Sequence, residues 1–262
     1  MVKRLKALLG AAHFAPTMTV TTLTFLLANQ SSDLSTALGI ALTFFTGQLI
    51  VGWSNDLIDF ADDQRHHRMN KPLVAGDISV RTLQAAIAVD TVALLALTFF
   101  GPLAFFYGVL HLIAVASALA YNAKLKSTPL SFLPYLVSFG LLPVIIVGAT
   151  KVEIKWWMPA IGALFGVGAH FANVFKDLEE DLASGIRGLP QLLGATLSKI
   201  ICAMCFGGGA LILYIVSQQG VALFLVAGGG IFLLPIPRKF AFPFAMALGL
   251  TVMLIFISAI RA

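Results

Sequence analysis

Apolar runs recur along the whole chain, and most of them are long enough to cross a lipid bilayer. The hydrocarbon core of a bilayer needs about 20 apolar residues in helical form. Apolar residues make up 59% of the 262 positions and charged residues 11%, whereas soluble domains contain roughly 25% charged residues. Helices satisfy their own backbone polar groups inside lipid. The sequence therefore predicts an all-α integral membrane protein.

Nine segments meet this length requirement, which predicts a single bundle of nine transmembrane helices. We expect one domain over residues 1–262, built from tandem four-helix repeats plus a final helix. The predicted helices cover residues 11–28, 34–53, 80–100, 102–120, 129–149, 156–176, 195–216, 220–236 and 240–260.

Basic residues are distributed unevenly between the two ends of these helices. Of the 17 Lys and Arg residues, all but Lys151, Lys155 and Arg261 fall on the side that holds the N-terminus. The positive-inside rule then predicts a cytoplasmic N-terminus and an external C-terminus. Topology also accounts for the pI near 9.4, so we do not expect a nucleic-acid partner.

Carboxylates are concentrated in two segments, 54–79 and 176–194, which hold nine of the 12 Asp and Glu residues. Four predicted helices separate the segments, so both open on the cytoplasmic face. Each cluster is followed by a basic residue, a Pro-Leu or Leu-Pro pair and a glycine, in KPLVAG and in GIRGLPQLLG. This shared order is the reason to expect a tandem duplication.

The acidic residues of each segment share one helical face. If the helix at 34–53 continues to about residue 63, Asp56, Asp59 and Asp63 stand at i, i+3 and i+7. Asp177 and Asp181 stand at i and i+4. Like charges placed in this way repel each other, so we expect cations to compensate them.

These oxygen ligands, without a cysteine or histidine partner, favour a hard cation. Mg²⁺ usually binds one or two carboxylates together with phosphate oxygens of a substrate. The pattern predicts a clamp for a diphosphate, with an apolar cavity behind it for an isoprenoid tail. A solvated loop remains the expectation for Asp62 and Glu179, which lie off the two faces. The bases suited to the remaining phosphate charge are Arg68, Lys71, Lys126 and Arg187.

These motifs resemble those of the UbiA superfamily of intramembrane prenyltransferases. The first motif is matched by Asn55-Asp56, Asp59 and Asp63, followed by Arg68 and KPLVAGDIS at 71–79. The second is matched by KDLEEDLASGIRGLP at 176–190, and YNAKLKSTP at 121–129 is similar to the stretch that ends the fourth helix. The chain departs from the family pattern at Lys71, where Arg is usual, and at Gly188, where Ser or Thr is usual.

The resemblance implies a Mg²⁺-dependent transfer of a prenyl group from a polyprenyl diphosphate to a lipophilic acceptor in the membrane. The implied catalytic residues are Asp59, Asp63, Asp177 and Asp181. The predicted metal ligands are Asn55, Asp56, Asp59 and Asp63 at one site and Asp177 and Asp181 at the other. The predicted diphosphate-binding residues are Asn55, Arg68, Lys71, Tyr121, Lys126 and Arg187.

Other functions fit parts of the same pattern. A terpene cyclase would use the clamp to ionise the donor and then close the cation on itself. A third possibility joins a lipid phosphate to a sugar phosphate. A transporter would bury ionisable groups near the membrane midplane, where only Asp90 is placed. The sequence leaves the acceptor, the prenyl chain length and the oligomeric state open.

Overall fold

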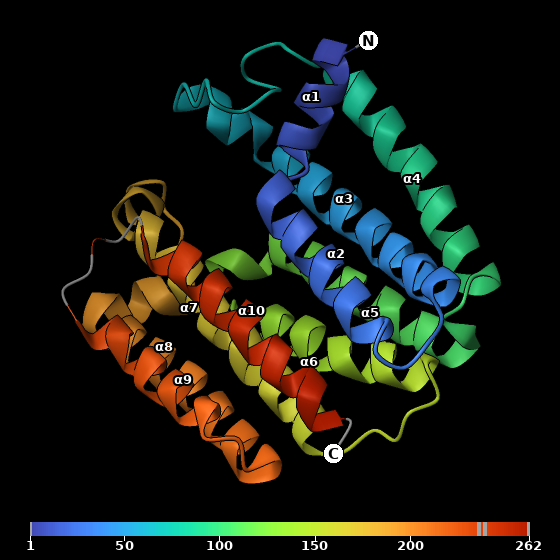
Figure 1. Ribbon diagram of the computed structural model, residues 1–262. Helices are drawn as coiled ribbons and strands as arrows, with labels where there is room; N and C mark the ends of the chain where they lie inside the picture. Colours follow the sequence, from blue (N-terminus) through green and yellow to red (C-terminus); the bar gives the residue numbers. More distant parts are fainter. Residues whose placement is uncertain (1, 235–236, 238–239, 261–262) are drawn as a thin grey trace. The chain divides into compact units, whose positions relative to one another are not determined.

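The computed structural model describes residues 2–234, 237 and 240–260, and this part of the chain is built from helices (Figure 1). Short 3₁₀ helices are η1 (Leu125–Ser127) and η2 (Ile231–Leu233). The α-helices are α1 (Val2–Ala11), α2 (Phe14–Ala28), α3 (Leu34–Arg65), α4 (Val80–Phe100), α5 (Ala104–Ala123), α6 (Leu133–Ala149), α7 (Trp157–Ala183), α8 (Leu189–Ser217), α9 (Val221–Gly230) and α10 (Ala241–Ile260).

The chain divides into two compact units, Met1–Ala123 and Lys124–Ala262, which we call unit 1 and unit 2. Unit 1 holds α1 to α5, and unit 2 holds η1, η2 and α6 to α10. The division falls between the fourth and fifth predicted helices, which is where a duplicated four-helix unit would divide. The duplication, the nine-helix count and the single domain stay predictions.

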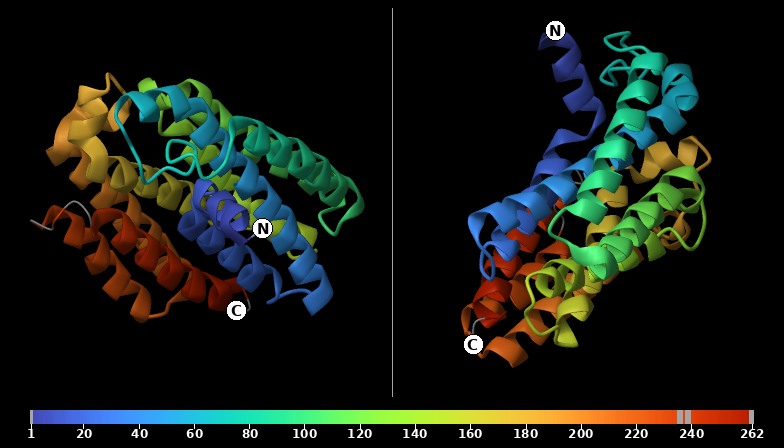
Figure 2. Two further views of the ribbon diagram at one scale, coloured as in Figure 1. Left: turned by 90° about the horizontal axis from the view of Figure 1, so that it is seen from above. Right: turned by 90° about the vertical axis from the view of Figure 1, so that its right-hand side faces the viewer.

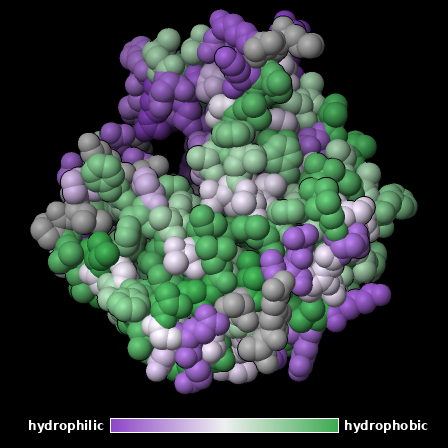
Figure 3. Space-filling model, in the orientation of Figure 1, coloured by the Kyte–Doolittle hydropathy of each residue, from purple (hydrophilic) through white to green (hydrophobic). Residues whose placement is uncertain are grey.

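The helices are apolar enough to identify an integral membrane protein. Five of those described pass a length and hydropathy test for a membrane span, namely α3, α4, α5, α8 and the 157–175 part of α7. The α1–α2 pair also passes together, whereas α6, α9 with η2, and α10 are apolar but shorter. Apolar side chains are widespread on the face drawn in Figure 3. Some predicted features lie outside the described residues, namely residues 235–236 of the predicted helix 220–236, and Arg238, Lys239 and Arg261.

The predicted helix 11–28 is wrong at its start, because the chain forms two helices there. The α1 and α2 helices meet at an angle of 74°. His13, at the break, has a left-handed backbone with φ of 50°. Pro16 lies in the first turn of α2, where a proline without an N–H costs little, and this is the sequence signal for a helix start.

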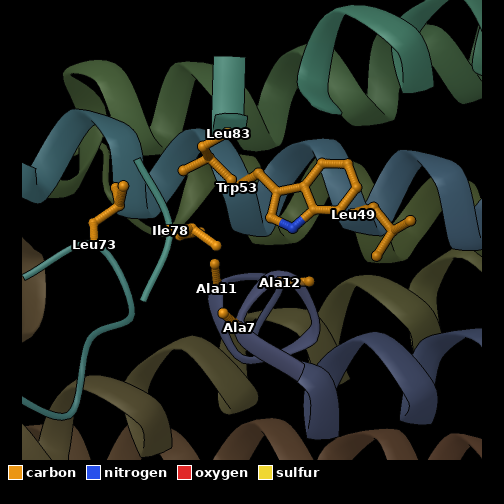
Figure 4. Close-up of a cluster of buried hydrophobic side chains, with 8 residues drawn as sticks. All are labelled: Ala7, Ala11, Ala12, Leu49, Trp53, Leu73, Ile78 and Leu83. Carbon is orange, nitrogen blue, oxygen red and sulfur yellow. The ribbon is translucent and has the colours of Figure 1, made fainter. Parts of the chain in front are cut away.

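In unit 1 the α1 helix packs against α3 through small residues (Figure 4). Ala7 and Ala11 face Trp53, Ile78 and other apolar side chains of one buried cluster. The indole Nε1 of Trp53 donates a hydrogen bond of 2.9 Å to the Leu8 carbonyl. The basic residues Lys3, Arg4 and Lys6, which count toward the predicted cytoplasmic side, thus lie on a helix whose far end is fixed to α3.

In unit 2 the α7 helix packs against α6 on one side and α8 on another (Figures 1 and 2). Aromatic rings fill the core of this unit. Phe206 makes an edge contact with Phe165 at a ring-centroid distance of 5.0 Å and stacks on Phe232 at 5.1 Å. This packing holds the two helices that carry the second acidic motif, α7 and α8.

Candidate functional site

The α3 helix continues beyond the membrane-length part and carries the first acidic motif on its last turns. It runs for 32 residues, or about 48 Å at 1.5 Å per residue, against about 30 Å for the hydrocarbon core. The expectation that the helix continues to about residue 63 is confirmed, since α3 ends at Arg65. Asp56, Asp59 and Asp63 therefore share one helical face.

An amide network fixes Asn55, the first residue of the motif. Its Nδ2 donates to Asp59 Oδ2 at 3.1 Å and to Asn122 Oδ1 at 3.5 Å. Asn122 is itself held by a 2.9 Å hydrogen bond from its Nδ2 to the Val51 carbonyl. His13 Nε2 lies 3.2 Å from Asn55 Oδ1. Both groups of the Asn55 amide are thereby oriented.

Cations compensate the buried carboxylates of α3, as the repulsion between them predicts. The side chains of Asp56 and Asp63 are each only 2% exposed. Lys71 Nζ lies 2.6 Å from Asp56 Oδ1, and Arg68 Nη1 lies 2.8 Å from Asp63 Oδ1. His13 Nε2 is 3.3 Å from Asp56 Oδ1. Carboxylates at a helix C-terminus also oppose the helix dipole, which adds to the need for these partners.

The second motif lies on the last turns of α7, in unit 2. Asp177 and Asp181 both belong to this helix, which ends at Ala183. Asp181 Oδ2 accepts a hydrogen bond of 2.8 Å from Gln191 Nε2. The exposed Arg187 donates through Nη1 to the Leu182 and Ile186 carbonyls at 3.0 and 3.2 Å. Its guanidinium therefore lies beside the helix end that carries the motif.

The helix predicted to start at residue 195 starts earlier, at Leu189, and brings Gln191 next to the motif. Gly194 has a non-helical backbone inside α8, with φ of 75° and ψ of 178°, so the predicted start coincides with this kink. Pro190 occupies the first turn, where its fixed φ suits a helix. Pro190 is a sequence signal for a helix start. Because Gly194 follows it four residues later, the first turn of α8 was not predicted as part of the helix.

The N-terminus of α8 is capped from another segment. Gly188 has no side chain to cap the helix, and the Leu189 N–H donates instead to Ser131 Oγ at 2.9 Å. His170 Nε2 lies 3.1 Å from the same hydroxyl. A Cβ atom on Gly188 would lie 2.6 Å from the Lys126 carbonyl oxygen, so the two backbones are in close contact. Unit 2 thus brings the predicted phosphate-binding residue Lys126 next to the second motif.

The α3 and α7 helices, which carry the acidic residues of the two motifs, end in the same type of turn. After Asp63, the Arg68 N–H donates to the Asp63 carbonyl at 3.0 Å and the His67 N–H to the Gln64 carbonyl at 3.2 Å. After Asp181, the Ile186 N–H donates to the Asp181 carbonyl at 2.9 Å and the Gly185 N–H to the Leu182 carbonyl at 3.2 Å. This is the Schellman pattern, with a left-handed residue, His67 or Gly185, at the same place.

The similarity continues beyond the turn. A proline follows nine residues after each of these aspartates, at Pro72 and Pro190. A glycine with positive φ follows thirteen residues after, at Gly76 with φ of 74° and at Gly194 with φ of 75°. The two motifs therefore share backbone conformation as well as residue order, which supports the proposed duplication.

The described residues do not gather three Asp, Glu, His or Cys side chains into one metal-binding group. The donor set still fits Mg²⁺, because this ion binds one or two carboxylates and completes its shell with water and phosphate oxygens. Asp56 Oδ2 is buried and makes no hydrogen bond within the described structure, so one motif oxygen still lacks a partner. Whether the carboxylates of unit 1 and unit 2 converge on one site stays a prediction.

Three polar residues outside the predicted set contact the motifs. His13 and Asn122 contact Asn55, and Gln191 contacts Asp181. In the sequence His13 reads as a lone histidine at a helix end, and Asn122 is marked only by its place beside Tyr121. Gln191 lies within the second motif segment, but it is uncharged, so a pattern of acidic and basic residues does not single it out.

Comparison with known proteins places these features in a family. The family model for the UbiA prenyltransferase family matches residues 15–243. No curated protein matches the chain.

Solved structures share the fold at low sequence identity. A digeranylgeranylglyceryl phosphate synthase is 17% identical, with a TM-score of 0.72 and full coverage of both chains. A UbiA homologue from Archaeoglobus fulgidus bound to GPP and Mg²⁺ is 16% identical, with a TM-score of 0.74 over 98% of this chain and 100% of that one. A homologue from Aeropyrum pernix K1 is 18% identical, with a TM-score of 0.71 over 92% of this chain and 97% of that one.

Proposed function

Because the chain belongs to the UbiA prenyltransferase family, we propose that it transfers a prenyl group from a polyprenyl diphosphate to a lipophilic acceptor in the membrane. The single observation that carries this proposal is the end of α3, where an oriented amide and three carboxylates on one face meet Arg68 and Lys71. Such a surface suits a doubly charged metal and the phosphate oxygens that it binds.

Mg²⁺ is the proposed cofactor. A structural neighbour was solved with GPP and Mg²⁺, and the oxygen donors of both motifs suit this ion. When bound, it would supply electrostatic stabilisation of the leaving diphosphate. The residues that would hold it are Asn55, Asp56, Asp59 and Asp63 in unit 1 and Asp177 and Asp181 in unit 2. Among these, Asp59, Asp63, Asp177 and Asp181 are the proposed catalytic carboxylates.

Basic side chains would bind the diphosphate oxygens that the metal leaves uncovered. Arg68 and Arg187 can offer paired N–H donors, and Lys71 and Lys126 offer a compact charge. Tyr121 and Asn55 complete the proposed diphosphate-binding set. The ion pairs of Arg68 with Asp63 and of Lys71 with Asp56 fix where the two cations stand before a substrate arrives.

The finer architecture is part of this proposal. We infer nine transmembrane helices in one domain, related by tandem four-helix repeats plus a final helix. The N-terminus and the active-site face are cytoplasmic, and the C-terminus is external. The shared turn after each motif supports the repeat, because equivalent aspartates precede equivalent backbone conformations.

Diphosphate release from a radiolabelled prenyl diphosphate tests the function. Purified protein should release diphosphate only with Mg²⁺, and Asp59→Ala should reduce the rate by at least about 100-fold, since it removes a ligand of the Mg²⁺ that would stabilise the leaving diphosphate. Asp62→Ala is the matched control, because Asp62 is part-exposed in the next turn and contacts His66 instead of the motif face. Equal rates for the two variants would contradict the proposed site.

Product analysis separates transfer from cyclisation. Transfer requires a second substrate, so addition of membrane lipid extract should accelerate diphosphate release and yield a prenylated acceptor. A cyclic hydrocarbon or alcohol formed from the donor alone, at a rate indifferent to the extract, would replace the transferase by a terpene cyclase. A prenyl-independent reaction with a sugar phosphate would point to a lipid-phosphate transferase.

A further inference from the structure

We propose that Gln191 is a positioning residue, which holds the Asp181 carboxylate in the orientation that binds metal. This inference rests on the proposed function of the second motif. Gln191 lies on α8, ten residues after Asp181 on α7, and its Nε2 donates to Asp181 Oδ2 at 2.8 Å. An amide donor fixes the direction of a carboxylate without adding a positive charge that would compete with a metal ion.

Burial shows that the Gln191 amide is held in one position. The residue is 7% exposed, and its Oε1 atom is buried without a hydrogen-bond partner in the described part of the chain. A Cβ atom on Gly188 would lie 2.7 Å from that Oε1 atom, so the glycine leaves the space that the amide fills. A buried unsatisfied oxygen costs stability, so this amide is poorly explained as a stabilising group.

The backbone of the turn that carries Gln191 is held by a contact with Ser131. Ser131 Oγ accepts the Leu189 N–H at 2.9 Å, and His170 Nε2 lies 3.1 Å from the same hydroxyl. These two contacts set the position of the first turn of α8 relative to α7. Gln191 therefore presents its donor to Asp181 from a turn that cannot easily shift.

In the first motif, a charged group orients the equivalent carboxylate. Asp63 and Asp181 occupy equivalent positions in the same Schellman turn, yet Asp63 is held by the Arg68 guanidinium at 2.8 Å. The residue ten positions after Asp63 is Leu73, which is buried in the apolar cluster of unit 1. An amide orients one motif carboxylate, and a cation orients the other.

Metal binding measured without turnover tests this role. The full-length protein in detergent would be titrated with Mn²⁺ in the presence of a non-hydrolysable prenyl diphosphate analogue, and free Mn²⁺ would be followed by electron paramagnetic resonance. Gln191→Leu keeps the size of the side chain and removes the donor. Loss of an outer partner of a metal ligand typically lowers metal affinity about 10–100-fold, so one class of Mn²⁺ site should weaken by that factor.

Activity gives a second readout that a purely structural residue would not change in this way. The Mg²⁺ concentration for half-maximal diphosphate release should rise at least tenfold in Gln191→Leu, while kcat at saturating Mg²⁺ returns to within a few-fold of the unaltered protein. Gln84→Leu is the matched control, because Gln84 is an exposed glutamine on α4. Gln191→Met provides a second donor-free variant if the leucine variant does not fold.

The outcomes separate this inference from the proposed function. If the unaltered protein binds no Mn²⁺ with the analogue, the proposed function fails. If it binds Mn²⁺ and a folded donor-free variant binds equally well, Gln191 has no positioning role and only this inference fails. A fall in kcat that excess Mg²⁺ does not restore would also overturn it.

Discussion

Arg68 closes the last turn of α3 with both its side chain and its backbone. Its Nη1 lies 2.8 Å from Asp63 Oδ1, and its N–H donates to the Asp63 carbonyl at 3.0 Å. The arginine predicted to bind diphosphate is thus already part of the helix end that presents the motif. Loss of this residue should consequently affect both the fold and the site.

Arg68→Ala should lower the free energy of unfolding by about 2–3 kcal/mol, because the buried Asp63 carboxylate loses a charge-assisted hydrogen bond. Donor affinity should also fall. Unfolding in a fixed detergent and the KM for the donor measure the two effects. Arg65→Ala is the control, since Arg65 is exposed at the end of the same helix. Equal effects of the two substitutions would show that the ion pair has no special role.

Lys71→Met should destabilise the protein by about 3 kcal/mol, because it leaves the buried Asp56 carboxylate without its ammonium partner. The double variant Asp56→Asn/Lys71→Met should recover at least half of that loss, since neither charge then remains. A double-mutant cycle on unfolding free energies measures the coupling. Additive effects would show that the two side chains do not stabilise each other.

His67→Gly should stabilise the protein by about 1 kcal/mol, and Gly185→Ala should destabilise it by about the same amount. Both residues occupy the left-handed position of the shared turn, which penalises a Cβ atom. Unfolding midpoints of the two variants give the sign directly. A fall in stability for His67→Gly would mean that the histidine side chain contributes more than its backbone strain costs.

Asp33 caps the N-terminus of α3, and its contribution should depend on pH. Hydrogen bonds from the Thr36 hydroxyl and the Thr36 N–H, at 2.7 and 3.1 Å, hold the pKa of the Asp33 carboxyl below its usual value. The stabilisation is therefore present above the unfolded-state pKa and is lost as pH falls through the folded-state pKa. Asp33→Ala should lower the unfolding temperature at pH 7 and have little effect under acid conditions. A pH-independent difference would contradict this assignment.

Cysteine labelling tests the predicted topology. In a variant without Cys202 and Cys205, which are buried free thiols, Ser32→Cys should react with a membrane-impermeant reagent from outside the cell. Pro237→Cys, in the predicted cytoplasmic connection beside Arg238, should react only after the membrane is opened. Labelling of both positions from one side would end the nine-helix topology.

Local patterns made much of the structure predictable. The spacing of Asp56, Asp59 and Asp63 predicted a shared face, and the structure confirms the continuous helix on which that face depends. Repulsion among these carboxylates predicted nearby cations, and Arg68 and Lys71 fill that role. The α1–α2 break was not predicted, because a left-handed residue such as His13 carries no signal in hydropathy.

The sequence by itself determined the membrane class, the family and the two acidic motifs, because these depend on apolar length, residue order and helical period. Only the tertiary structure decided which side chain orients each motif. The contacts of Asn55 with His13 and Asn122 join residues 42 and 67 positions apart, and α8 folds back to place Gln191 on Asp181. Such partners are selected by the packing of helices, and helical periodicity relates only residues within a few turns of each other.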